Sequence, residues 1–200
     1  MKNIMASLFI FMFGFSLAFA GETTSKLSVS VEQLPPSLVD LDNFLVLAKE
    51  VQPHRSARLL HLDEFLELSR KDNVILLDAR SARAFSIAHL KGAINLDFTD
   101  FSQAALQRII PDKNTTILIY CNNNFSGQEN NLLLASAFPS KVAINQQAIG
   151  SSLPIMLALN LQTYINLYGY GYTNVYELAD LVPVTDPRIV FEGEVNSSKE

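Results

Sequence analysis

Two short apolar runs, each followed directly by a polar or reactive side chain, constrain the fold of this chain most. Residues 74–78 read Val-Ile-Leu-Leu-Asp, and residues 115–120 read Thr-Thr-Ile-Leu-Ile-Tyr, with Cys121 next. Unbroken runs of this length are typical of strands buried on both faces, as in a parallel sheet. Parallel strands need long crossover connections, so the pattern predicts an α/β domain.

Segments with helical spacing of apolar residues alternate with these runs. We therefore expect a small parallel sheet with helices on both faces, preceded by an N-terminal helical extension that Pro53 ends. The expected strands are residues 58–61, 74–78, 93–96, 115–120 and 174–178. The expected helices are residues 37–51, 62–70, 82–88, 101–110 and 132–134, and one that Pro154 starts and that continues through Tyr168.

Composition excludes several classes of protein. Of the 200 residues, 48% are hydrophobic and 18% are charged, which indicates a folded domain rather than a disordered chain. The net charge is −5, and no run of basic residues is longer than two. Nucleic acid is therefore not an expected partner.

The first 20 residues have the pattern of an export signal. A positive charge at Lys2 precedes an apolar run, and small residues at Ala18 and Ala20 fit a cleavage site. We expect cleavage after Ala20 and a periplasmic or secreted chain without a membrane span. The alternative is an uncleaved anchor, although the run is short for one. The remaining chain divides into a leader and N-terminal helix (21–56), a domain (57–182) and a C-terminal tail (183–200).

Cys121 is the single cysteine of the chain. An exported chain with one cysteine cannot form an internal disulfide, so the thiol is either buried and inert or reactive. It lies where a central strand opens into the polar loop Asn122–Gly127. Ligands of open α/β sheets bind at this end of the strands, which favours a chemical role.

Three ordered blocks resemble the rhodanese homology domain. The first block has two parts. Asp78-Ala79-Arg80, directly after a strand, is similar to the D-x-R pattern of that family, and Ala88-His89-Leu90-Lys91-Gly92-Ala93-Ile94-Asn95 is similar to its G-H-I-x-G-A-x-N pattern. The second is the strand that ends in Cys121, and the third is Gly169–Leu178, similar to a late G-Y-x-x-V-x-x-L strand. The resemblance covers residues 58–181.

The resemblance implies a sulfurtransferase in which Cys121 carries a persulfide and passes the sulfur to a thiophilic acceptor. The following loop would hold the anionic donor on backbone N–H groups, as a nest does. The expected donor-binding residues are Asn122, Asn123, Asn124, Phe125, Ser126, Gly127 and Lys141. Asp78, Arg80 and His89 are expected to support the site structurally.

Two departures from the family pattern keep a second function open. Active members usually have a basic residue about five positions after the cysteine, where this chain has Ser126. About 40 residues also separate Gly127 from Gly169, which indicates an insertion. The alternative is therefore a non-catalytic rhodanese-like module that binds a partner or senses redox state.

Other chemistries find no support in the sequence. A phosphatase loop of the C-x5-R type needs an arginine where this chain has Gly127. No spacing of histidines, cysteine and carboxylates fits a metal site, and no glycine-rich phosphate loop occurs. We expect no cofactor and no metal, and a small sulfur donor or a thiol acceptor, which could be a protein, as partner.

Overall fold

The computed structural model describes residues 34–143, 155, 156 and 158–197. The chain divides into two units, Met1–Val39 and Asp40–Glu200. Of the first unit, residues 34–39 are described, and they form no helix or strand. The predicted export signal lies outside the described residues. Every helix and strand described below belongs to the second unit.

A five-stranded parallel sheet forms the centre of the second unit, in the order β1-β9-β5-β2-β4. Strand β5 is central and pairs with β2 over five residues, so that Asp78 lies opposite Tyr120 where both strands end. The predicted parallel sheet is confirmed. The strands are β1 (Leu59–Leu60), β2 (Val74–Asp78), β4 (Ile94–Asn95), β5 (Thr116–Tyr120) and β9 (Val175–Leu178).

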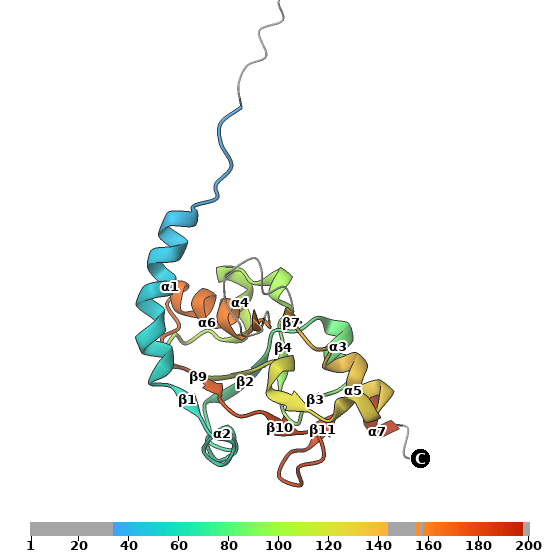
Figure 1. Cartoon of the computed structure of the whole chain (residues 1–200). Coiled ribbons are helices and arrows are strands. Elements are labelled where there is room, and N and C mark those ends of the chain that lie inside the picture. The colour runs from blue at the N-terminus through green and yellow to red at the C-terminus, as the bar shows by residue number, and fades with distance from the viewer. Residues whose placement is uncertain (1–33, 144–154, 157, 198–200) are drawn as a thin grey trace, which may run out of the picture. The chain divides into compact units, whose positions relative to one another are not determined.

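Helices cover both faces of this sheet, as predicted, because alternate strand residues point to opposite sides. Ile117 and Ile119 of β5 enter one apolar cluster, and Leu118 and Tyr120 enter the other. Figure 1 shows α1, α4 and α6 on the upper side and α2 on the lower side. The first cluster includes residues of α1 (Leu41–Ser56), α4 (Gln103–Ile109) and α6 (Asn160–Gly169); the second includes residues of α2 (Leu62–Ser69), α3 (Ala82–Ile87) and α5 (Leu132–Ala137).

Short elements complete the domain around the sheet. Three two-stranded pairs join β3 (His89–Leu90) to β11 (Phe191–Glu192), β6 (Phe125–Ser126) to β10 (Val182–Pro183), and β7 (Val142–Ala143) to β8 (Ile155–Met156). The short helices are η1 (Phe98–Asp100), η2 (Asn122–Asn124), η3 (Gln128–Asn130) and α7 (Glu194–Ser197). None of the described helices is both long and apolar enough to span a membrane.

The segment that reads as a tail in the sequence packs on the domain up to residue 197. Ile189 and Val195 are buried in the same cluster as α2, α3 and α5. Gly193 has φ 116°, and a Cβ atom there would lie 2.6 Å from the carbonyl oxygen of Ser86. The C-terminal segment therefore closes against the end of α3 at a position that only glycine fits.

The first helix differs from its prediction at both ends. It begins at Leu41, because the Asp40 carboxylate accepts a hydrogen bond from Asn43 N–H at 3.0 Å and caps the helix. It continues past Pro53 to Ser56, so the prediction that Pro53 ends it is wrong. Proline costs the helix one backbone hydrogen bond, but the following turn is anchored by two hydrogen bonds from Arg55 to Glu177 on β9.

The predicted helix from Pro154 through Tyr168 is also wrong in its first part. Residues Ile155–Met156 form β8 and pair with β7, and the helix begins at Asn160. Pairing with a distant strand leaves no periodic signal in so short a segment, whereas Leu157, Leu159 and Leu161 extend the helical spacing backwards. Pro154, where the helix was predicted to start, lies outside the described residues.

Candidate functional site

Cys121 lies at the carboxyl end of β5, in the centre of the sheet. Cys121 is 2% exposed. The chain then turns through η2 and β6 to Gly127, which has φ 77°. No lysine or arginine occurs in residues 122–127, so the loop after the thiol contributes N–H groups and amide side chains but no fixed positive charge.

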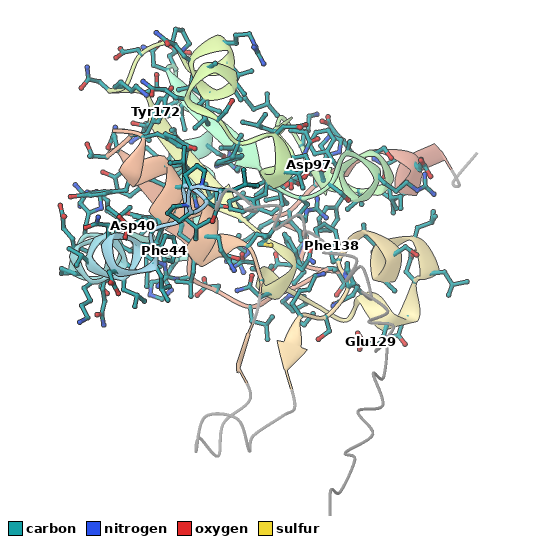
Figure 2. The ribbon with its side chains drawn as sticks, turned by 90° about the horizontal axis from the view of Figure 1, so that it is seen from above. Asp40, Phe44, Asp97, Glu129, Phe138 and Tyr172 are labelled. Carbon is teal, nitrogen blue, oxygen red and sulfur yellow. The ribbon has the colours of Figure 1, made fainter. Side chains whose placement is uncertain are left out.

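A cavity of about 310 Å³ adjoins Cys121, and four further stretches of the chain line it. Its lining contains one flexible cation, Lys141, and one carboxylate, Asp97; Figure 2 labels Asp97 at the turn after β4. The predicted residues Cys121, Asn122, Arg80 and Lys141 therefore come together here. The remaining lining residues are Ser81, Ala84, Phe98, Thr99, Pro139 and Leu159.

The Cys121 sulfur accepts a hydrogen bond from the beginning of α6. Leu159 precedes this helix directly, and its N–H lies 3.4 Å from Sγ. Burial raises the pKa of the Cys121 thiol, while the backbone N–H groups of Leu159 and Asn122 and the charge of Arg80 act to lower it. Burial prevails, so the resting thiol is protonated at neutral pH. The site nevertheless offers donors that a sulfur anion would accept.

A chain of polar contacts fixes the loop that carries the thiol. Asn124 Oδ1 accepts a hydrogen bond from Cys121 N–H at 2.9 Å, and its Nδ2 donates to the Leu178 carbonyl at 2.8 Å. Asn160 Nδ2 donates both to Asn124 Oδ1 at 3.2 Å and to Glu177 Oε1 at 3.0 Å. The buried Glu177 also accepts two hydrogen bonds from Arg55, at 2.6 and 2.7 Å. The contacts thus run from α1 to the cysteine.

Asp78 and Arg80 form a buried ion pair beneath the cavity. They are 0% and 3% exposed, and Arg80 Nη2 lies 2.5 Å from Asp78 Oδ2. The guanidinium also donates to the carbonyls of Ala88 and Ala137, and Tyr120 donates its hydroxyl to Asp78 at 2.6 Å. These contacts connect β2 and β5 with α5 and with the residue that follows α3.

The other predicted residues lie around the cavity or away from it. Asn123, Phe125, Ser126 and Gly127 line a second cavity of about 360 Å³, which shares Asn122 and Lys141 with the first. Phe125 is 3% exposed and packs against Phe138 and Phe191.

His89 is stacked on Phe85, and its Nδ1 lies 2.8 Å from the Phe85 carbonyl oxygen. The described residues that line the Cys121 cavity do not include His89.

Buried amide oxygens without a partner occur beside the thiol. Within the described part of the chain, Asn122 Oδ1, Asn123 Oδ1 and Asn160 Oδ1 have no hydrogen-bond donor. Asn122 is 7% exposed and lines the cavity with Cys121. Buried polar atoms normally have partners, so a bound donor or acceptor molecule would find available hydrogen-bond acceptors here as well as donors.

Sequence reasoning missed three residues of this site: Leu159, Asn160 and Glu177. Glu177 gives a usable signal, because it is a carboxylate in the otherwise apolar strand Val-Tyr-Glu-Leu, and buried carboxylates need partners. Leu159 and Asn160 give none, since both fall within the helix that was predicted to begin earlier. In the described residues, no group of three or more histidines, cysteines and carboxylates could hold a metal ion.

Comparisons with known proteins identify a family for this chain. The model of the family "Rhodanese-like domain" matches residues 61–180. Among solved structures, BH2092 protein from Bacillus halodurans is similar over 76% of this chain and 88% of its own, with 14% identity and a TM-score of 0.41. A "rhodanese with anions" from E. coli is similar over 60% of this chain and 98% of its own, with 21% identity and a TM-score of 0.33. No curated protein matches the chain. Because the family model covers more than half of the residues, the chain belongs to the family of rhodanese-like domains.

Proposed function

We propose that this rhodanese-like domain is a sulfurtransferase that carries sulfane sulfur as a persulfide on Cys121. The observation that carries the proposal is the position of the thiol. It lies at the carboxyl end of the central strand, beside a cavity, with the Leu159 N–H directed at Sγ. A persulfide on Cys121 would be an anion, and N–H groups at the beginning of a helix stabilise anions.

The reaction consists of two balanced displacements. The Cys121 thiolate attacks the sulfane sulfur of a donor, the S–S bond of the donor breaks, and its electron pair leaves with the donor's other sulfur. The outer sulfur of the resulting persulfide is then attacked by an acceptor thiolate, and Cys121 leaves as the thiolate. No external oxidant or reductant is needed. Lys141, as the flexible cation of the cavity, would hold an anionic group of donor or acceptor.

The burial of Cys121 favours a second candidate, a non-catalytic module that binds a partner. The thiol is 2% exposed and its pKa is raised by burial, both of which oppose nucleophilic attack at neutral pH. The loop also lacks the cation that active members usually carry. The two candidates differ in one measurable property, the ability of Cys121 to accept sulfur.

Intact-mass spectrometry after incubation with a sulfane donor separates them. We expect an adduct of about 32 Da, the mass of one sulfur atom, which a thiol acceptor removes. The matched control is Cys121→Ser, which changes one atom of the side chain and should gain no mass. An unmodified wild-type protein after exposure both to thiosulfate and to an organic persulfide would support the binding module instead.

We also propose that the protein acts outside the cytoplasm. The support is the sequence of residues 1–20, with its charged start, apolar run and small residues before Gly21. N-terminal sequencing of the exported protein should begin at Gly21. Recovery of the full-length chain in the cytoplasm alone would contradict export.

A further inference from the structure

One face of α1 exposes large apolar side chains on consecutive turns. Leu41, Phe44 and Leu45 are 64%, 42% and 50% exposed, and Ala48 continues the same stripe. Residues spaced by three and four positions share a helix face. Figure 2 labels Phe44 on α1, which lies beside α6 in this view. Contiguous exposed apolar surface of this kind marks an interaction site rather than an ordinary helix surface.

The apolar stripe borders a groove between α1 and α6. The groove encloses a cavity of about 430 Å³, and most of its exposed lining is apolar. Leu161 on α6 is 49% exposed at its edge. A groove between two helices accepts the side chains of a third helix, which packs its ridges into the available depression. The lining residues are Leu45, Ala48, Lys49, Val51, Gln52, Arg55, Leu161 and Ile165.

The charges beside the stripe point to one occupant. Asp42 and Lys49 are seven residues apart and so lie on the same flank of α1. Neither forms an ion pair with another of the described residues. When two copies of one helix pack antiparallel, each flank faces the same flank of the other copy. A register that places Leu45 against Ala48 of the second copy then brings Asp42 next to its Lys49.

We propose that this face binds a second copy of the chain, with α1 packed antiparallel on α1. The arrangement is isologous, so the Asp42–Lys49 contact forms twice, and the apolar stripe of each copy covers the same stripe of the other copy. A lipid surface fits less well, because helices that lie on membranes carry mainly lysine and arginine on their polar face. The polar face of α1 has mixed charge, with Asp42 and Glu50 as well as Lys49.

Sedimentation equilibrium over a range of concentrations tests the dimer. The purified chain should approach twice its monomer mass, which is 22.2 kDa for the 200 residues before any cleavage, and Leu45→Glu should return it to the monomer mass. The matched control is Leu132→Glu, because Leu132 is 86% exposed on α5, outside the groove. It should leave association unchanged. A wild-type chain that stays monomeric, or a Leu45→Glu variant that still dimerises, would overturn the proposal.

Charge reversal tests the antiparallel register independently of the apolar stripe. Asp42→Lys and Lys49→Asp each place like charges together at two symmetric positions, so each should weaken association about tenfold. The double variant Asp42→Lys/Lys49→Asp restores opposite charges across the interface and should recover wild-type association. Single reversals without effect, or a double variant weaker than both, would refute the register and with it the proposal.

The hydrogen bonds of Asn160 support a second inference, which rests on the proposed persulfide chemistry. Asn160 is 5% exposed, and it follows Leu159, whose N–H is bonded to the sulfur. Its side chain joins the cysteine loop, through Asn124, to Glu177. We infer that Asn160 is a positioning residue that holds the beginning of α6 against the Cys121 sulfur.

Alkylation of Cys121 by iodoacetamide at different pH values tests this role without requiring sulfur transfer. Asn160→Ala should shift the midpoint of the pH profile to higher pH by about one unit. The alkylation rate near neutral pH should then fall about tenfold, because less of the thiol is ionised there. Asn166→Ala is the matched control, because it removes an amide of the same helix that donates to the Gln162 carbonyl. An unchanged profile for Asn160→Ala, or an equal change for Asn166→Ala, would overturn the inference.

Discussion

Removal of Arg80 should destabilise the domain far more than removal of any exposed arginine. Asp78 is 0% exposed in the wild-type domain, and in Arg80→Ala its carboxylate loses its counter-charge while the carbonyls of Ala88 and Ala137 lose their donors. Breaking a buried ion pair on one side costs about 3–5 kcal/mol. For a chain of this size, that corresponds to a fall in the melting temperature of roughly 6–20 °C.

Thermal and urea unfolding measured by circular dichroism provide the assay. The matched control is Arg83→Ala, because Arg83 pairs with Glu194 at 2.9 Å on the surface, with 73% of its side chain exposed. Exposed pairs contribute less than about 1 kcal/mol. The double variant Asp78→Asn/Arg80→Met removes both charges and should unfold later than Arg80→Ala. Equal losses for the Arg80 and Arg83 variants would refute the view that the buried pair supports the site.

Three further predictions concern sulfur transfer. Ser126→Arg should lower the KM for thiosulfate without raising kcat, because the new guanidinium can donate two hydrogen bonds to the anion. Ser126 lines the second cavity, which shares Asn122 and Lys141 with the first. An unchanged KM would contradict this prediction. Lys141→Ala should raise the KM for an anionic donor severalfold while the Cys121 alkylation rate is unchanged; steady-state kinetics and iodoacetamide labelling measure the two. Because burial raises the pKa of Cys121, the rate of persulfide formation should still rise at pH values where the reaction of a free cysteine has already reached its plateau. A stopped-flow pH profile measures whether it does.

The centre of the fold was predictable from the sequence because it is buried on both faces. Strand β2 coincides with its prediction at residues 74–78, and β5 differs by one residue, because long apolar runs leave few alternatives. Both deliver Asp78 and Cys121 to the same edge, so the centre of the site was predictable too. The resemblance added the roles that spacing alone could not assign.

The edges of the site were not predictable, for two physical reasons. The helix α6 begins after Leu159 without a side chain that caps it, so the usual sequence signal for its start is missing. The strands β6, β8, β10 and β11 have two residues each and exist through long-range pairing, which has no period in the sequence. The contacts of Asn160 and the packing of the C-terminal segment depend on these elements.

The strand order of the sheet also determines when the domain can close during synthesis. Among the described strands, β1 has one partner in the sheet, β9, so Leu59 has no strand to pair with until Glu177 has been synthesised. During synthesis from the N-terminus, β1 therefore has no place in the sheet until β9, at residues 175–178 of 200, has emerged. Contacts so distant in sequence form slowly. Late pairing therefore leaves the backbone N–H and C=O groups of β1 without their partners in the sheet until β9 is available.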